Sequence, residues 1–310
     1  MKINFGYVAI SMKLKDASPN RTITLKSLSK IEKSLWKNKL REIAQKNIEN
    51  TMRIIRYNSA YGIKLYRMTS KIVPLATHDE LRDWNWQEEL SKEFYELGLC
   101  IKENNIRVST HPDHYTLLNS PKEEVLKSSI KDLDYHCKMF ELMDLGYEAK
   151  MVIHVGGSYN NKSESIKRFY ENYSNLDENI RKRIILENDD KIFNAQDVLK
   201  ICKDLKIPMV LDVHHHICNQ GNVKLEEIIG DIFDTWNGEI YVPKIHLSSP
   251  KSDRDIRSHH DFIDVKNFLD FINTIRFIKC DFDVMVEAKM KDIAVFKLME
   301  DLYGIEYIKK

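Results

Sequence analysis

Short apolar runs alternate with amphipathic segments along the whole chain, and this alternation constrains the fold more than any other feature. The apolar runs have the length and composition of buried parallel strands, whereas the segments between them carry apolar residues at helical spacing. Eight strands are expected, over residues 2–9, 63–68, 107–110, 149–155, 183–187, 209–212, 241–247 and 282–287. Such alternation indicates parallel strands joined by helical crossovers.

The eightfold alternation predicts an α/β protein, a TIM-type (β/α)8 barrel that forms one catalytic domain over residues 1–310. Barrels of about 250 residues are routinely single domains, and no linker-like or low-complexity stretch divides this chain. The alternative is an open, doubly wound sheet. It is less favoured because no GxGxxG motif follows the first strand, and the pair Gly156-Gly157 is a weak signal for a phosphate cradle.

Composition restricts the possible classes of protein. The five cysteines are scattered and never form a CxxC pair, which argues against a disulfide framework and against a cysteine zinc site. The N-terminus does not have the pattern of a signal peptide, and nowhere do about 18 apolar residues run together. We therefore expect a cytoplasmic protein that does not associate with membranes. Nothing indicates an obligate protein partner, so a monomer is expected.

The charge is unevenly distributed. The chain carries a net charge of only +1, which argues against a basic surface over the whole molecule. Residues 11–56, however, hold twelve Lys and Arg against four Asp and Glu. This block could lie along a phosphate backbone, or it could be the solvated face of a long helix, which is the commoner case.

The stretch 209–218 joins an apolar run to a group of polar side chains. The run ends at Asp212, and His214, His215 and His216 follow it. If the chain turns just after the strand, Asp212 and His215 can reach the same point, and mixed oxygen and nitrogen donors of this kind hold zinc or manganese. The alternative is that Asp212 caps the next segment and that the histidines are solvated on a loop.

Side chains of the metal-ligand type recur at the ends of the expected strands. They are His111, His154, Glu187, Asp212, His215, His246 and Glu287. Ten of the eleven histidines lie at or just after a strand end, and only His136 falls within an expected helix. A single histidine at a strand end is more often structural than a ligand. In a parallel barrel, however, all these ends open on one face, so the pattern predicts a multinuclear metal centre there.

Two kinds of chemistry fit such a centre. Several ions can generate hydroxide and neutralise the attacking and leaving oxygens of an in-line displacement at phosphorus. A pair of ions can also polarise the carbonyl and hydroxyl groups of an aldose during isomerisation. The ligands alone do not decide between the two.

Taken in order, nine motifs resemble the UV damage endonuclease family, whose barrel is similar to those of endonuclease IV and the xylose isomerase-like enzymes. The matching stretches are Gly6-Tyr7, YRMTSKIVPLATH ending at His78, RVSTHPDHY, VIHVGG, LENDD, LDVHHH, KIHLSSP, SHHDF and VMVEAK. The resemblance covers the chain to about Lys291.

The resemblance implies a metal-dependent DNA repair endonuclease. Such an enzyme would incise damaged double-stranded DNA immediately 5′ of ultraviolet photoproducts and some other lesions, such as abasic sites, and leave a 3′-hydroxyl and a 5′-phosphate. It would use up to three divalent ions, expected to be Mn²⁺, with Zn²⁺, Mg²⁺ or Co²⁺ as alternatives. A xylose isomerase-like sugar isomerase or epimerase, and a non-catalytic DNA-binding barrel, are the alternative functions.

The resemblance also implies residue roles. The implied metal ligands are His111, His154, Glu187, Asp212, His215, His246, His259 and Glu287. The first three would hold one ion, and Glu187 would bridge to a second ion that is shared with Asp212, His246 and Glu287. His215 and His259 would complete a third site, with the adjacent His260 as an alternative. No role follows for His214 and His216, which are expected to serve hydrogen bonds of their own loop.

Three further residues match catalytic or supporting positions. Lys244, two residues before His246, would act beside the metals and can be carboxylated. His78 and Tyr7 match positions near the site.

The main departure from the family pattern follows the ligand His111. The expected Pro-Gly-Gln-Tyr is replaced by residues 112–115, Pro-Asp-His-Tyr. The resemblance implies that His114 and Tyr115 probe the DNA at the lesion, where Tyr115 can stack on a base and His114 can form hydrogen bonds. The substitution bears on lesion preference more than on strand cleavage.

Overall fold

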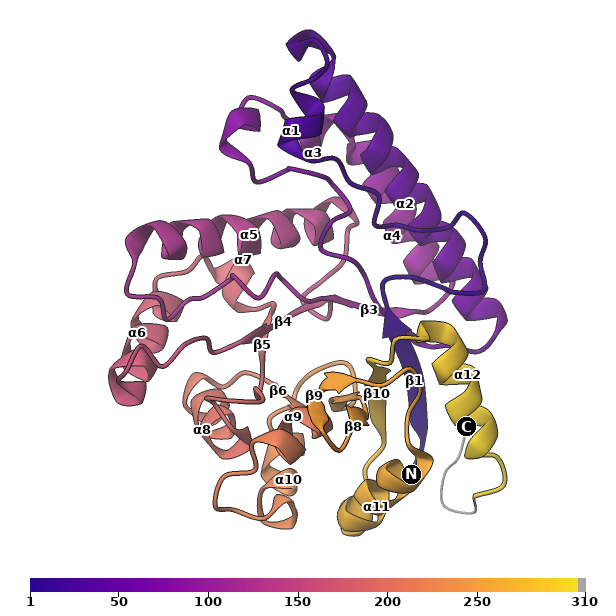
Figure 1. Cartoon of the computed structure of the whole chain (residues 1–310), viewed down its shortest axis with the longest axis vertical. Coiled ribbons are helices and arrows are strands. Elements are labelled where there is room, and N and C mark those ends of the chain that lie inside the picture. Colours follow the sequence, from indigo (N-terminus) through magenta and orange to yellow (C-terminus); the bar gives the residue numbers. More distant parts are fainter. Residues whose placement is uncertain (306–310) are drawn as a thin grey trace.

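Eight parallel strands close into a barrel in the computed structural model, which describes residues 1–305 (Figure 1). Around the barrel the strands follow the order β1, β10, β7, β6, β5, β4, β3 and β2. Their bounds are β1 (Ile3–Val8), β2 (Leu65–Arg67), β3 (Arg107–Thr110), β4 (Lys150–His154), β5 (Ile184–Glu187), β6 (Met209–Asp212), β7 (Lys244–Leu247) and β10 (Phe282–Val286). The predicted (β/α)8 barrel is confirmed, and closure excludes the open doubly wound sheet.

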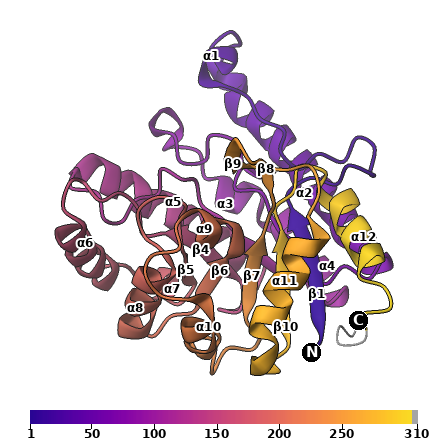
Figure 2. The same ribbon diagram turned by 60° about the horizontal axis from the view of Figure 1, so that its bottom comes forward.

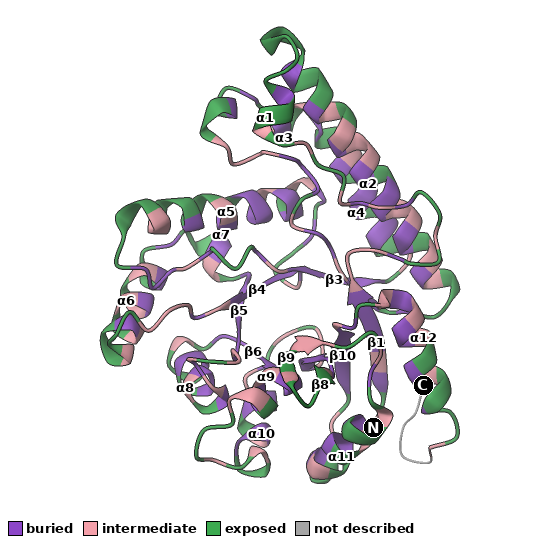
Figure 3. Ribbon diagram, in the orientation of Figure 1, coloured by how far each residue is buried: buried purple, intermediate pink, exposed green. Residues whose placement is uncertain are grey.

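Helices cover the outside of the barrel. The long ones are α2 (Trp36–Ala60), α4 (Ser91–Glu103), α5 (Glu123–Leu142), α6 (Lys162–Ser174), α8 (Ala195–Leu205), α10 (Leu225–Asp234), α11 (Val265–Ile275) and α12 (Lys291–Asp301). The short ones are α1 (Leu25–Leu28), α3 (Trp86–Glu89), α7 (Glu178–Arg181), α9 (Val213–Cys218) and the 3-10 turns η1 (Lys33–Leu35), η2 (Asp79–Leu81) and η3 (Arg276–Ile278). Figure 3 shows buried strands and helices whose outer faces are exposed. Within residues 1–305, no helix is long and apolar enough to cross a membrane.

Helix α8 illustrates how the sequence defines these elements. It begins at a capping box, in which the Asn194 side chain accepts from the backbone N–H of Asp197 and the Asp197 side chain accepts from that of Asn194. It ends at Lys206, which adopts a left-handed conformation with φ of 56°. Between these ends, Val198 and Cys202 face the barrel and are buried. Capping and apolar spacing therefore agree on the position of this helix.

Side chains that point into the barrel change character along its axis. At the N-terminal end of the strands, Arg107 of β3 and Asp283 of β10 form a buried ion pair of 2.6 Å. Further along, Val152, Ile185 and Val210 form an apolar layer. Because alternate residues of a strand face the same side, the next inward positions are those at the C-terminal ends. Those positions hold the expected metal ligands.

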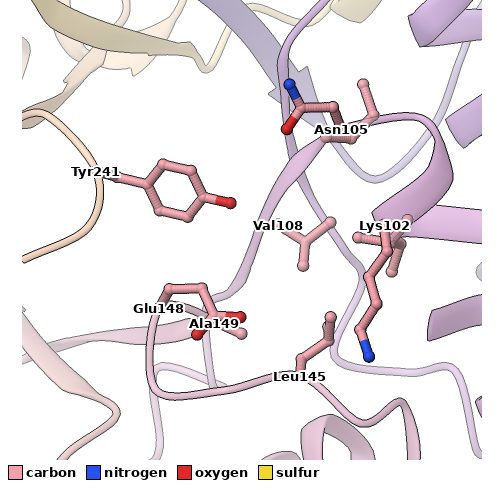
Figure 4. A pocket seen from close by; sticks show the side chains of 9 residues that line it. Lys102, Asn105, Val108, Leu145, Glu148, Ala149 and Tyr241 are labelled. Carbon is pink, nitrogen blue, oxygen red and sulfur yellow. The ribbon is translucent and has the colours of Figure 1, made fainter. Parts of the chain in front are cut away.

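A cavity at the N-terminal end of the barrel is separate from the ligands. It has a volume of about 240 Å³ and is lined by residues that include Lys102, Asn105, Glu148 and Tyr241 (Figure 4). These residues precede β3, β4 and β7. In barrels of this kind this end contributes stability, whereas active sites lie at the other end.

A hairpin follows β7, in a polar stretch where no strand was expected. Strands β8 (Pro250–Ser252) and β9 (Asp255–His259) pair antiparallel, with Pro250 opposite His259 and Ser252 opposite Asp255. At the turn between them, the backbone N–H of Asp255 donates to the Ser252 hydroxyl at 3.2 Å. The hairpin gave no sequence signal because its strands are short and lack an alternating apolar pattern.

Two other expectations about local structure were wrong. Apolar residues at helical spacing from residue 24 onward favour a single long helix. Instead, the chain turns after α1 and the long helix begins at Trp36, whose indole N–H donates to the carbonyl of Ile31 at 3.2 Å. The histidines after β6 were expected on a loop, but they lie in α9, where His214 and His216 are buried. Asp212 caps this helix by accepting from the backbone N–H of His215 at 2.7 Å, so capping and ligation are not exclusive roles.

Candidate metal centre

Six of the eight expected metal ligands meet at the C-terminal end of the barrel. They are His111 after β3, His154 of β4, Glu187 of β5, Asp212 of β6, His246 of β7 and Glu287 after β10. The strand register aligns them, because His154 pairs with Glu187 and Asp212 pairs with His246 on neighbouring strands. Strand pairing, rather than loop conformation, therefore positions most of the cluster.

The ligands form two close groups that share one carboxylate. His111, His154 and Glu187 offer ligand atoms within 4.8 Å of one another, as do Glu187, Asp212, His246 and Glu287. In the first group, Glu187 Oε2 lies 3.1 Å from His111 Nε2 and 3.8 Å from His154 Nε2.

The second group joins the first through the other oxygen of Glu187. His246 Nδ1 lies 2.8 Å from Glu187 Oε1 and 3.1 Å from Glu287 Oε1. Glu187 is 1% exposed, and its Oε2 contacts His111 while its Oε1 contacts His246. A carboxylate shared in this way is suited to bridging two cations.

His215 and His259 lie beside the second group without belonging to either. His215 Nδ1 is 3.6 Å from Asp212 Oδ2 and 3.0 Å from the carbonyl oxygen of Asn188. His259, on the hairpin, lies 2.8 Å through Nδ1 from the carbonyl oxygen of Glu287. His260 is exposed, and its Nδ1 accepts from the backbone N–H of Phe262 at 3.0 Å. Of the two neighbouring histidines, His259 is therefore the one that contacts a residue of the cluster, through its backbone.

Burial and neighbouring charges set the protonation of the carboxylates. Burial alone would raise the pKa of Glu187, but His246, His154 and His111 outweigh it and hold that pKa well below its usual range. Burial, with Glu187 adding to it, raises the pKa of Asp212 to about 7. The cluster thus combines Glu187, which is an anion at neutral pH, with Asp212, whose carboxyl group titrates near neutral pH.

Unsatisfied polar atoms show what the cluster can accept. Asp212 Oδ2 and His246 Nε2 are buried and have no hydrogen-bond partner within residues 1–305. Burying a polar atom without a partner costs about 1–3 kcal/mol, and a divalent cation would satisfy such atoms. Imidazole and carboxylate donors without cysteine suit manganese or zinc. The residues present therefore fit a divalent metal centre.

Lys244 lies within the barrel below the ligands. It is 2% exposed, and its Nζ donates to the Ser109 hydroxyl at 3.1 Å. Burial, together with the charges of Arg107 and Arg67, holds its pKa well below the usual range. It occupies the inward position two residues before His246, so it shares the interior with the cluster.

The other predicted site residues are placed differently. Tyr7 is not brought to the cluster: its position on β1 faces the helices, and its hydroxyl donates to Asn58 of α2 at 2.7 Å. His78 caps η2, and its Nδ1 accepts from the backbone N–H of Glu80 at 3.2 Å. His114 and Tyr115 lie in the loop after β3, with ring centroids 3.9 Å apart, and Tyr115 is 71% exposed.

Two residues of the site were missed by sequence reasoning. Arg67 of β2 forms an ion pair with Glu287. Burial alone would raise the pKa of Glu287, but Arg67 and His246 hold it well below its usual range. Asn188 fixes Asp212 by donating to its carbonyl oxygen at 3.0 Å and accepting from its backbone N–H at 2.9 Å. The available signal was a charged or amide side chain at the end of an expected strand.

Fold and cluster together define a (β/α)8 barrel whose C-terminal end carries residues that could hold a metal ion. Among solved structures, endonuclease IV from Thermus thermophilus is similar in fold, with a TM-score of 0.55 and 12% identity over 96% of this chain and 97% of that one. A 3-keto-D-glucoside 4-epimerase from E. coli is about as similar, with a TM-score of 0.57 and 11% identity over 97% of this chain and 98% of that one. At such identities these matches show the fold alone.

Closer similarity defines the family. The family model described as UV-endonuclease UvdE matches residues 3–310. A relative named UV DNA damage endonuclease, from Bacillus cereus (strain 03BB102), is 41% identical over 310 residues, which cover 100% of this chain and 98% of the relative. The crystal structure of SacUVDE has a TM-score of 0.88 and 33% identity over 98% of this chain and 99% of that one. This chain belongs to the UV-endonuclease UvdE family.

Proposed function

We propose that this protein is a metal-dependent DNA repair endonuclease that incises double-stranded DNA at ultraviolet lesions. Family membership and the name of the relatives, UV DNA damage endonuclease, support the activity. The metal dependence rests on one observation, the buried Glu187 carboxylate shared by two groups of ligands. That arrangement is suited to holding two cations near one phosphate.

The chain's own residues would bind and orient the ions. His111 and His154 would hold one ion with Glu187, and the second group would hold another. His215 and His259 would complete a third position beside Asp212. When bound, divalent ions, for which we propose Mn²⁺, would activate water and neutralise charge on the attacking and leaving oxygens.

Lys244 would act as a further polar group beside the ions. Its burial next to Ser109 leaves it without a carboxylate partner among the described residues, which favours the proposed carboxylation. In that reaction the neutral amine adds carbon dioxide to form a new N–C bond and releases one proton, so that an uncharged group becomes an anionic carbamate. Intact mass measurement under bicarbonate, with Lys244→Met as the control, tests the modification.

Recognition of the lesion is assigned to the loop after β3. The exposed ring of Tyr115 is available to stack on a base, and His114 lies against it. We propose incision immediately 5′ of the lesion, with 3′-hydroxyl and 5′-phosphate products, and activity at abasic sites.

Tyr7 would support the site through its contact with α2, and His78 through the turn that it caps. A monomer in the cytoplasm is the proposed form.

Plasmid nicking tests the proposal. The purified protein is incubated with Mn²⁺ and supercoiled plasmid, either irradiated or untouched, and conversion to nicked circles is measured. We expect nicking of irradiated plasmid only, and its loss in Glu187→Gln. End-labelled duplexes with one photoproduct give the side of incision and the end groups. An absence of nicking by metal-loaded protein would contradict the proposal and favour the sugar isomerase or epimerase class.

A further inference from the structure

The segment after β1 lies against helix α2 and extends along it away from the barrel. The Arg53 side chain donates to the carbonyl oxygen of Lys15 at 3.0 Å, and the Asn50 side chain donates to that of Ser18 at 2.8 Å. One turn further along the helix, Asn47 donates to the carbonyl oxygen of Arg21 at 2.9 Å. The segment therefore runs antiparallel to α2, and every third residue of the segment contacts every third residue of the helix.

Helix α2 extends beyond the face that carries the metal ligands. Asn47 also donates to the carbonyl oxygen of Ile72, in the loop after β2, so it lies level with loops of that face. The eleven residues from Trp36 to Lys46 continue for about 16 Å past this level. In Figure 2, α1 and the start of α2 accordingly rise above the hairpin of β8 and β9.

The cations of this segment form no ion pair in the part of the chain that the structure describes. We call residues 13–36 the arm. Within residues 1–305, no ion pair involves the arm's six cations, Lys13, Lys15, Arg21, Lys26, Lys30 and Lys33. All six are exposed, and the arm contains only two carboxylates, Asp16 and Glu32. The positive charge of this arm is therefore available to a partner.

Cations on the adjoining helix differ in this respect. On α2, Arg41 lies 3.8 Å from Glu89, and Lys46 lies 2.8 Å from Glu49. Lys37 donates to the carbonyl oxygen of Asp83 at 2.8 Å. Glu42 and Glu49 of α2 and Glu89 of α3 therefore neutralise part of the charge on α2, whereas the arm has no such pairs within residues 1–305.

We propose that the arm follows the phosphate backbone of the duplex beside the damaged site, an inference that rests on the proposed function. From Arg53 to Trp36 the helix spans about 25 Å, which matches about seven base pairs of duplex at 3.4 Å each. Exposed lysines contact phosphates regardless of sequence, so the arm would add affinity and orientation without reading bases. It would contact only one of the two flanks, because it stands on one side of the barrel (Figures 1 and 2).

Salt dependence of binding tests the arm. In the variant Lys26→Gln/Lys30→Gln/Lys33→Gln, the slope of log affinity against log salt concentration should fall by about 2 to 3, since each phosphate contact contributes about 0.9. Binding is measured by fluorescence anisotropy with an irradiated duplex. The control Lys102→Gln/Lys182→Gln/Lys203→Gln makes the same change of charge near the opposite end of the barrel, at ends of α4, α7 and α8. Its slope should match that of the unmodified protein.

Two further measurements separate the arm from catalysis. Shortening the duplex on one flank should weaken binding by the unmodified protein and have little effect on the arm variant. The nicking rate at saturating DNA should be unchanged in the arm variant, because none of its three residues lies in the metal centre.

Distinct outcomes overturn distinct claims. Equal salt slopes for the arm variant and the unmodified protein, in a preparation that nicks irradiated plasmid, would overturn the arm alone. An equal loss of slope in the control would also overturn it, since any surface charge would then suffice. Failure of the unmodified protein to bind or nick irradiated DNA would instead refute the proposed function.

Discussion

Metal binding at this centre is expected to displace protons. Burial, reinforced by Glu187 and Glu287, raises the pKa of Asp212 to about 7. Burial would lower the pKa of His215, but the charges of Asp212 and Glu187 outweigh it and raise that pKa to about 9. Without ions, both groups are more protonated near neutral pH than they would be in the unfolded chain, so a cation must compete with protons for both.

The size of the effect follows from these two pKa values. At pH 7, His215 is almost fully protonated and Asp212 about half protonated, so a cation that binds both releases about 1.5 protons from these two groups. His246 adds to this count where it is a ligand, because Glu187 and Glu287 outweigh burial and raise its pKa as well. Because both pKa values are raised, affinity falls as the pH falls. Between pH 6 and pH 8 the affinity should rise about 1,000-fold, with about 100-fold from His215 and about 10-fold from Asp212. The rise should level off above the pKa of His215.

Calorimetry measures the released protons directly. Chelator-treated protein is titrated with Mn²⁺ at pH 7 in buffers of different protonation enthalpy, and the dependence of the heat on that enthalpy gives the proton count. Asp212→Asn should reduce the count by at least about 0.5, because it removes a group that is half protonated at pH 7 and the carboxylate that helps to raise the pKa of His215. Asp234→Asn, an exposed position on α10, should leave the count unchanged. A release below about 0.5 proton in the unmodified protein would refute the reasoning.

Three further substitutions test other parts of the molecule. Tyr115→Ala should weaken incision at photoproducts and leave the metal content intact, as measured by nicking and elemental analysis; loss of metal would show that the residue has been misplaced. Arg107→Met should destabilise the protein by about 3–5 kcal/mol in denaturant unfolding, because Asp283 keeps a buried charge without its partner. Adding Asp283→Asn should recover part of that loss, and no recovery would argue against the charge as its cause. Asn194→Ala should cost about 1 kcal/mol by removing the N-cap of α8, whereas no change would mean that the capping box contributes little.

The sequence alone predicted the architecture and the face on which the expected metal ligands lie. Apolar runs and helical spacing are local patterns, so they identify strands and helices before any tertiary contact is known. Because all strands of a parallel barrel open on one face, the sequence also predicted that expected ligands as distant as His111 and Glu287 lie together. The same patterns could not show the hairpin of β8 and β9, whose side chains carry no apolar alternation.

Only the tertiary structure decided how these residues meet. The two groups share Glu187 because the register of β4 on β5 sets its neighbours, and Arg67 pairs with Glu287 because closure of the barrel brings β2 near β10. Tyr7 faces α2 rather than the cluster, since its strand position points outward. The arm, which is part of the basic block, extends past the barrel because α2 has 25 residues and is longer than the barrel strands, of which β1 has 6. Register, closure and relative length depend on residues far apart in the chain, and no local pattern encodes them.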